Sequence, residues 1–366
     1  MKTLYYNGKI ISEGQLFEGA VLAENGFVAD ILPGSRELPP ADEKIDLHGA
    51  YLAPGFVDTH IHGCGDFGAD SKNPRDLLEM SKLLLKQGVI AFAPTIYPGK
   101  IDDMADTLQK LAPAIGREEG AKILGFHLEG PFISPDKPGV MKPADIQPIN
   151  IESAKKLYTV ANGKITAMTV APELENIDKL AAFAGENNFI LQAGHTNATY
   201  EQMLQAAQLG IKHATHLFNA TSPLNHRAPG APGAVLTDGR FTTEIIADGA
   251  HLHPAVVKMI LMLKGPCNIM LVSDVIKQGI ANGEEVQLKG NVFRRKSDDV
   301  IAGGALGMLD GLKNLVKWGY PLAYASMAAS DNPAALYKLN AGAIAKGKAA
   351  QFVVLDKDLN LQNVIF

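Results

Sequence analysis

The sequence predicts an α/β fold, a (β/α)8 barrel of the TIM type with a small β-sandwich domain formed by the N- and C-terminal segments. Three observations support this prediction. Eight short apolar strands can be counted after residue 51, helix-like segments lie between them, and both ends of the chain have β character. Alternating strands and helices imply a parallel sheet, and eight is the number of strands that closes such a barrel.

The small domain is predicted from the two ends of the chain. Short apolar runs alternate with turn signals such as Asn7-Gly8 and Asn25-Gly26 over the first fifty residues. The last thirty residues return to the same β character. We therefore expect residues 1–51 and 337–366 to form the small domain, and residues 52–336 to form the barrel.

The predicted barrel strands are short apolar runs separated by helical segments. They are residues 52–59, 89–95, 123–129, 165–171, 189–195, 211–216, 242–247 and 268–273. Among the helical segments, residues 75–87 follow Asn73-Pro74 and stop at Gly88. Pro/Gly-rich loops at residues 131–143 and 221–233 follow two of the strands, on the face where barrel enzymes build their active sites.

Composition and charge argue against several classes of protein. The 34 basic residues are spread along the chain and the formal net charge is -5, so we expect no nucleic-acid partner and no membrane partner. The apolar runs are too short to span a bilayer. With two cysteines, Cys64 and Cys267, and no signal-peptide pattern at the N-terminus, we expect a cytoplasmic protein with reduced thiols and a small-molecule ligand.

Histidines and one carboxylate stand at the ends of four predicted strands. Strand one ends in His60-Ile61-His62, and because side chains alternate along a strand, both imidazoles point the same way. Taken alone, this pair is equally well explained as two solvent-facing or hydrogen-bonded histidines. Strands three, five and six add Glu129, His195 and His216 at the same rim. Nitrogen and oxygen donors that converge on one point are typical of a divalent metal site.

The eighth strand ends at Asp274, which brings a second carboxylate to this rim. A metal-dependent hydrolase needs a group that takes a proton from the attacking water and returns it to the leaving amine. Asp274 is the candidate for this role, although by itself it is more simply explained as the N-cap of a following helix. His127 and His213 alternate with the proposed ligands, and we expect them to lie behind these ligands or in the core.

Several motifs resemble those of the amidohydrolase superfamily and, within it, those of the N-acetylglucosamine-6-phosphate deacetylases. The two most specific are His-Leu-Glu-Gly-Pro at residues 127–131 and Thr-His-Leu-Phe-Asn-Ala at residues 215–220. Further matching stretches span nearly the whole chain, at residues 54–63, 194–196, 247–251, 272–274 and 332–334. The resemblance implies a barrel fold and hydrolysis of an amide bond.

The resemblance also implies a set of metal ligands. Glu129, His195 and His216 would hold one divalent ion, and His60 and His62 would join Glu129 around a second. Glu129 would then bridge the two ions. We therefore expect one or two divalent ions per chain, with zinc, iron or a similar metal in the site.

Further residues are implied to act on the substrate, with Asp274 as the acid and base. The implied substrate-binding residues are His251 for the sugar, Asn219, Ala220 and Arg227 for the phosphate, and Met141 and Met308. Backbone N–H groups after Asn219 and the forked guanidinium of Arg227 suit a phosphate dianion. Without the resemblance, Arg227 would be taken for a surface charge in a Pro/Gly-rich loop. A homodimer is expected, and Arg227 can then act across its interface.

One position departs from the family pattern. Many members carry a histidine that polarises the acetyl carbonyl, in the loop where this chain has Met141. A methionine side chain cannot donate a hydrogen bond. If this alignment of the loop is right, carbonyl polarisation falls to another group, and the His60-Ile61-His62 pair offers a second metal ion for it. If the alignment is wrong, a nearby residue such as His226 can donate instead.

The expected function is deacetylation of N-acetylglucosamine 6-phosphate to glucosamine 6-phosphate and acetate by a metal-activated water, in amino-sugar catabolism and recycling. Two alternatives stay open. Another amidohydrolase reaction, that of a cyclic amidase or an aminohydrolase, would act on an unphosphorylated substrate. A catalytically silent barrel would instead bind an amino-sugar phosphate as a sensor. The retention of Asp274 and of five candidate ligands favours an enzyme.

Overall fold

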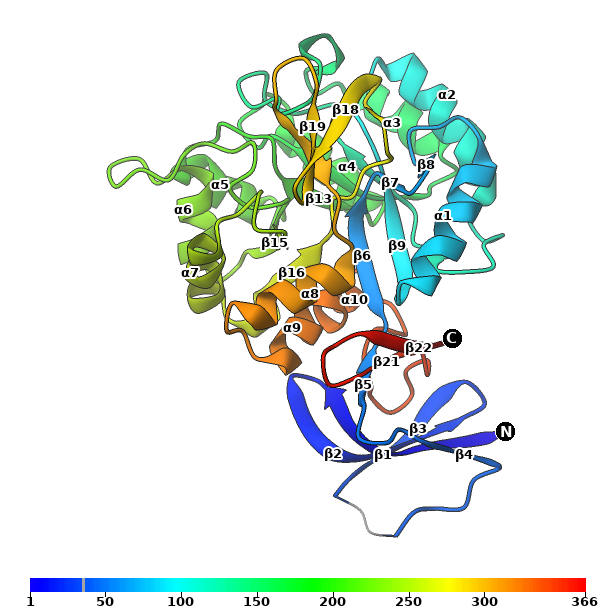
Figure 1. The fold of residues 1–366 in the computed structure, drawn as a ribbon. Coiled ribbons are helices and arrows are strands. Elements are labelled where there is room, and N and C mark those ends of the chain that lie inside the picture. The colour runs from blue at the N-terminus through cyan, green and yellow to red at the C-terminus, as the bar shows by residue number, and fades with distance from the viewer. Residues whose placement is uncertain (35–36) are drawn as a thin grey trace.

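The barrel is the larger of two units in the computed structural model, which describes residues 1–34 and 37–366 (Figure 1). Its parallel strands are β6 (Phe56–Ile61), β9 (Val89–Ile96), β11 (Phe126–Glu129), β12 (Ile165–Val170), β13 (Ile190–Ala193), β14 (His213–Ala214), β15 (Thr242–Ile246) and β16 (Ile269–Val272). The short β10 (Lys122–Ile123) also pairs with β9. Each predicted strand thus has a counterpart in the described part of the chain, and the predicted fold class is confirmed.

The first and last barrel strands meet through side chains and backbone at the mouth. The N–H of Asp274, which follows β16, donates to the carbonyl of His60 in β6 over 3.0 Å. The Ser273 hydroxyl donates to the carboxyl group of Asp58 over 2.5 Å. Burial raises the pKa of this carboxyl group to about 7. The ends of strands one and eight are therefore held next to each other.

The strand predicted over residues 52–59 is wrong in one respect, because it consists of two strands. β5 (Tyr51–Pro54) belongs to the small domain, and only β6 belongs to the barrel. The break falls at Gly55, where a Cβ atom would lie 2.2 Å from the Cγ2 atom of Ile90. An unbroken apolar run does not reveal a change of sheet. The domain boundaries proposed from the sequence stay predictions.

The small domain is built from both ends of the chain, as predicted. Its strands are β1 (Lys2–Ser12), β2 (Gln15–Glu24), β3 (Phe27–Pro33), β4 (Glu43–Asp46), β5, β21 (Phe352–Leu355) and β22 (Leu361–Ile365). Hydrogen bonds join them into one sheet in the order β22-β21-β5-β1-β2-β3, with β4 beside β1. The two halves share a core, where the rings of Tyr5 and Phe352 lie 5.8 Å apart edge to face.

The helices cover the outside of the barrel (Figure 1). They are α1 (Pro74–Lys86), α2 (Ile101–Leu111), α3 (Ile151–Val160), α4 (Ile177–Glu186), α5 (Tyr200–Gln208), α6 (Gly230–Thr237), α7 (Pro254–Lys264), α8 (Met308–Lys317), α9 (Leu322–Ala329) and α10 (Asp331–Leu336). The start of α1 follows the predicted cap, since the Asn73 side chain accepts from the N–H of Arg75 over 3.1 Å. Over the described ranges, no helix combines the length and the apolar character needed to cross a membrane.

A further small sheet lies over the barrel mouth, and the sequence did not predict it. It consists of β17 (Ile280–Ala281), β18 (Glu284–Lys289), β19 (Val292–Arg295) and β20 (Ile301–Gly304), inserted between β16 and α8 (Figure 1). A shorter pair, β7 (Gly63–Cys64) and β8 (Phe67–Gly68), follows β6. The Arg295 guanidinium donates to the carbonyl of Val140 over 3.1 Å. The inserted sheet is thereby joined to the loop at residues 131–143.

Candidate metal centre and active site

The five predicted metal ligands meet around the carboxylate of Glu129. Its Oε1 atom lies 2.9 Å from Nε2 of His216, 3.1 Å from Nε2 of His195 and 3.3 Å from Nε2 of His60. Its Oε2 atom lies 3.1 Å from Nε2 of His62. All five side chains are at most 5% exposed. The structure therefore brings together the whole predicted set.

The backbone aims these side chains from the carboxyl ends of the strands. His195, His216 and Asp274 each come two residues after a strand, and their φ angles are 46°, 22° and 49°. A residue other than glycine in this left-handed region costs on the order of 1–3 kcal/mol, and such strain gathers at functional sites. Three such residues at one rim indicate that the strand ends are bent to turn their side chains towards a common point.

The donor set fits a divalent metal. Ligand atoms that surround a tetrahedral ion at about 2.0–2.1 Å stand roughly 3.3 Å apart, which is close to the spacings around Glu129. Donor atoms of His60, Glu129 and His216 lie within 4.8 Å of one another, and so do those of His60, His62 and Asp274. Buried Nε2 of His60 finds no hydrogen-bond partner among the described residues. The cluster is a site for a divalent metal, while the assignment of each ligand stays a prediction.

The electrostatics of the cluster also favour a bound cation. Burial by itself would raise the pKa of Glu129, but the neighbouring imidazoles, His60 first, lower it well below its usual range. Burial would lower the pKa of His60, yet the carboxylates of Glu129 and Glu244 raise it well above its usual value. Burial lowers the pKa of the His216 imidazole. A buried carboxylate is stabilised by a nearby positive charge, and a neutral imidazole can bind a metal through its free lone pair. Both properties favour a bound divalent ion.

Asp274 lies at the edge of this cluster. Its Oδ1 atom is 3.5 Å from Nε2 of both His60 and His62, and its Oδ2 atom is 3.8 Å from Nε2 of His251. The chain continues from Asp274 towards β17 and not into a helix, so the N-cap explanation is wrong. The carboxylate is therefore placed between the candidate ligands and the substrate side of the mouth.

A cavity of about 290 Å³ opens next to the cluster, and four of the predicted substrate-binding residues line it. They are Met141, Asn219, Ala220 and His251. The Asn219 amide donates to the carbonyl of His216 over 3.2 Å. The His251 ring is held through Nδ1, which lies 2.6 Å from Oδ2 of Asp248. Its other ring nitrogen faces Asp274.

The structure does not bring two predicted residues to this cavity. Arg227 is exposed in the loop at residues 221–229, where its N–H donates to the Asn225 side chain over 3.0 Å. Met308, the first residue of α8, is buried against a separate cavity of about 200 Å³ that also contains Asp58 and Cys64. Met308 does not line the cavity beside the cluster, so its position does not support contact with substrate there.

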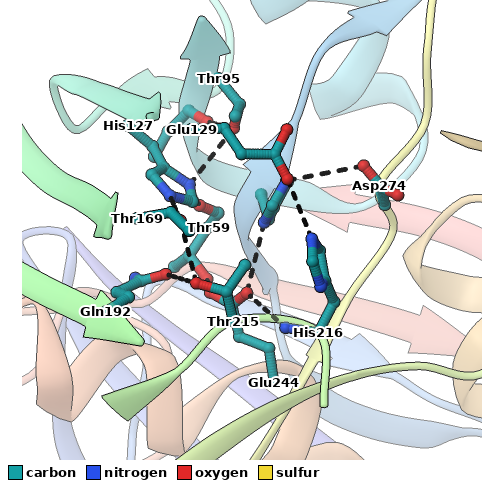
Figure 2. A network of polar contacts seen from close by, with 12 residues as sticks. Thr59, Thr95, His127, Glu129, Thr169, Gln192, Thr215, His216, Glu244 and Asp274 are labelled. Carbon is teal, nitrogen blue, oxygen red and sulfur yellow. Dashed lines mark hydrogen bonds and ion pairs between the residues drawn. The ribbon is translucent and has the colours of Figure 1, made fainter. Parts of the chain in front are cut away.

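Two residues near the cluster were missed in the sequence. The Tyr97 ring stacks on His62 with centroids 3.9 Å apart, and its buried hydroxyl has no hydrogen-bond partner within the described ranges. Glu244 lies on the other side of the candidate metal ligands from Glu129, as Figure 2 shows. A charged residue in the apolar strand Thr242–Ile246 was the available signal for Glu244. His127 makes contacts behind the ligands, as expected, with Nε2 2.8 Å from the Thr169 hydroxyl.

Gly194 directly precedes the candidate ligand His195 and is closely packed inside the barrel. A Cβ atom at residue 194 would lie 2.6 Å from Cβ of Thr215 and 2.9 Å from Cγ2 of Thr169. We expect Gly194→Ala to destabilise the protein by about 1–3 kcal/mol, because a packed core does not accept an extra methyl group. Urea unfolding measures this change. The matched Gly185→Ala adds its methyl where nothing lies within 4 Å, and should stabilise α4 by roughly 0.5–1 kcal/mol; equal effects would contradict the packing argument.

Known proteins resemble the chain over both units. A model of the amidohydrolase family matches residues 51–366. The N-acetylglucosamine-6-phosphate deacetylase of Bacillus subtilis is 30% identical over 95% of this chain and 92% of its own length. The N-acetylgalactosamine-6-phosphate deacetylase of Escherichia coli O157:H7 is 30% identical over 97% of this chain and 95% of its own.

A solved structure supports the same comparison. It is that of a mutant N-acetyl-D-glucosamine-6-phosphate deacetylase from Mycobacterium smegmatis in complex with N-acetyl-D-glucosamine 6-phosphate. Its sequence is 27% identical to this chain, and the match covers 100% of this chain and 97% of that chain with a TM-score of 0.91. The similarity therefore includes the small domain as well as the barrel.

Proposed function

The chain belongs to the amidohydrolase family, and from this premise we propose that it hydrolyses the N-acetyl group of N-acetylglucosamine 6-phosphate. The products are acetate and glucosamine 6-phosphate, and the reaction is placed in cytoplasmic amino-sugar catabolism and recycling. The observation that carries this proposal is the cluster of Glu129, four imidazoles and Asp274 beside the cavity. A sensor without activity would need no carboxylate at the edge of a metal cluster.

The metal ligands are assigned within this proposal. Glu129, His195 and His216 would hold one divalent ion, and His60 and His62 would join Glu129 around a second. Zinc and iron suit this mixture of imidazole and carboxylate donors. When bound, such an ion lowers the pKa of a water and stabilises negative charge on a carbonyl oxygen.

Asp274 is assigned to move the proton. Its carboxylate takes a proton from the water as the water oxygen adds to the acetyl carbonyl carbon. It returns this proton to the amide nitrogen as the C–N bond breaks, so that acetic acid and an amine form. The acid then gives its proton to the amine or to solvent and leaves as acetate. Asp274 ends the cycle as it began. Its place between His62 and His251 supports this role, because it reaches both the ligand layer and the cavity.

The remaining residues would hold the sugar phosphate. His251 is fixed by Asp248 with its Nε2 atom facing Asp274, and it can bind the sugar next to the reacting amide. Asn219 and Ala220 line the cavity and are assigned to the phosphate. Arg227 is exposed outside the cavity of its own chain. We therefore propose a homodimer in which Arg227 of one protomer completes the phosphate site of the other.

Acetate release from defined substrates tests the proposed function. The enzyme, reconstituted with zinc or iron, is assayed with N-acetylglucosamine 6-phosphate, N-acetylgalactosamine 6-phosphate and N-acetylglucosamine. We expect release from a phosphorylated sugar to exceed release from the unphosphorylated one. If none of these sugars releases acetate, but a cyclic amide or an aminopurine assayed in parallel is turned over, the chain catalyses another amidohydrolase reaction. If calorimetry shows tight binding of the phosphorylated sugar without turnover, the chain is a sensor.

Arg227→Ala should distinguish phosphate recognition from a structural role. A hydrogen bond to a charged group contributes about 1.5–3 kcal/mol, so we expect kcat/KM for the phosphorylated sugar to fall roughly 10–100-fold. Activity on unphosphorylated N-acetylglucosamine should change little. Steady-state kinetics on both substrates measures the difference, with Arg240→Ala as a control because Arg240 is paired with Asp238 on the surface. Equal losses on both substrates would make Arg227 structural.

A further inference from the structure

Glu244 is a carboxylate inside the barrel that the proposed mechanism does not use. It lies in β15 and is fully buried. Its Oε2 atom lies 3.3 Å from Nδ1 of His60, and its Oε1 atom lies 3.4 Å from the Thr59 hydroxyl and 3.5 Å from Nε2 of His213. The N–H of His216 donates to Oε2 over 3.4 Å. Glu244 thus contacts residues of β6 and β14 and the strand end that follows β14.

A buried carboxylate at this position needs an explanation. Moving an unpaired charge out of water costs several kcal/mol, so such groups are kept only where hydrogen bonds or opposite charges compensate them. The partners around Glu244 are imidazole, hydroxyl and backbone N–H donors, and two of these donors belong to candidate metal ligands, His60 and His216. The compensation is therefore tied to the metal cluster.

The His60 ring connects this carboxylate to the metal centre. Nδ1 faces Glu244, while Nε2 lies 3.3 Å from Oε1 of Glu129 and 3.5 Å from Oδ1 of Asp274. As a metal ligand the His60 imidazole must be neutral and carry one proton, and a carboxylate at Nδ1 keeps that proton on this nitrogen. The lone pair of Nε2 then points at the cluster. Histidines that bind metals commonly have their second nitrogen fixed in this way.

We propose that Glu244 is a positioning residue that fixes the tautomer and orientation of His60 and thereby strengthens binding of the ion that His60 holds. This inference rests on the proposed metal ligands. Glu244 touches neither substrate nor metal, and its effect passes through the His60 ring. Its contact with the His216 N–H also ties the strand end that carries a second ligand to the same carboxylate.

A double-mutant cycle on ion binding tests this inference. Glu244→Gln keeps the size of the side chain and removes its charge. Wild type, Glu244→Gln, His60→Ala and the double variant are titrated with Zn²⁺ in competition with a chromophoric chelator, with no substrate present. We expect Glu244→Gln to weaken binding of one ion about 10–100-fold in the wild-type background, and to have no further effect where His60 is alanine.

The control variant is Thr169→Val, which removes a buried hydroxyl that contacts His127 and Thr215 but none of the candidate ligands. It should bind Zn²⁺ as wild type does. An equal loss for Glu244→Gln in both backgrounds, or no loss in either, would overturn the inference. Because the titration needs no substrate, a protein that shows the coupling but no deacetylase activity would contradict the proposed function alone.

A measurement on the unaltered protein covers the case in which Glu244→Gln does not fold. The ring nitrogens of ¹⁵N-labelled histidine report the tautomer in the zinc-loaded protein. We expect His60 to carry its proton on Nδ1. A proton on Nε2 would overturn the inference, since the lone pair would then face Glu244 and not the metal.

Discussion

Asp274→Asn is expected to lower kcat by roughly 10²–10⁴-fold, the range typical of a lost general acid and base. The amide keeps the shape of the side chain but cannot accept the proton of the attacking water. Metal content should stay at the wild-type value, because Asp274 is assigned to move the proton and the asparagine oxygen can still occupy its place 3.5 Å from Nε2 of His60 and of His62. Turnover and bound metal are measured on the same preparations.

The matched control is Asp299→Asn, which makes the same chemical change at an exposed surface ion pair with Lys289. It should leave turnover unchanged. A rate for Asp274→Asn within a few-fold of wild type would remove Asp274 from the mechanism. A loss of metal together with the loss of rate would instead assign Asp274 as a ligand.

The cluster could be predicted from the sequence because its residues are tied to strand ends. Glu129 ends β11, and His195 and His216 each follow a strand by two residues. The carboxyl ends of parallel strands meet at one rim of a barrel, so chain position alone brings these side chains together. The same reasoning placed Asp274 correctly, since β16 ends two residues before it.

Contacts between distant parts of the chain could not be predicted. His60 and Glu244 are 184 residues apart, and the neighbours of Glu244 in sequence do not reveal that its carboxylate faces an imidazole. The inserted sheet was missed because its strands are short, and in β18, the longest of them, one of six residues is buried, which leaves little alternation to detect.

Met141 is where the sequence was expected to depart from the family pattern, and the structure shows where this residue lies. The side chain is buried and lines the cavity, and its sulfur lies 4.0 Å from the amide nitrogen of Asn282. A thioether offers no hydrogen to a carbonyl oxygen. Polarisation of the acetyl group would then depend on metal ions. His60 belongs to both groups of donor atoms that could hold such an ion, one with Glu129 and His216 and one with His62 and Asp274.

His60→Ala and His62→Ala are therefore each expected to lower kcat/KM on the order of 10²-fold or more, because a Lewis acid contributes several kcal/mol to stabilising the oxyanion. Glu129, His195 and His216 remain in both variants, so one ion should still bind. Met141→Ala should stay within a few-fold of wild type, since it removes no hydrogen-bond donor. Metal content and deacetylase rate are measured side by side.

The control for loss of an imidazole is His48→Asn, an exposed position in the small domain whose φ of 50° asparagine tolerates. It should retain both metal and rate. A fully active form of His60→Ala with one bound ion would end the argument for dependence on two metals. Carbonyl polarisation would in that case belong to the ion at Glu129, His195 and His216 alone, and the absence of a donor at Met141 would need no second ion to offset it.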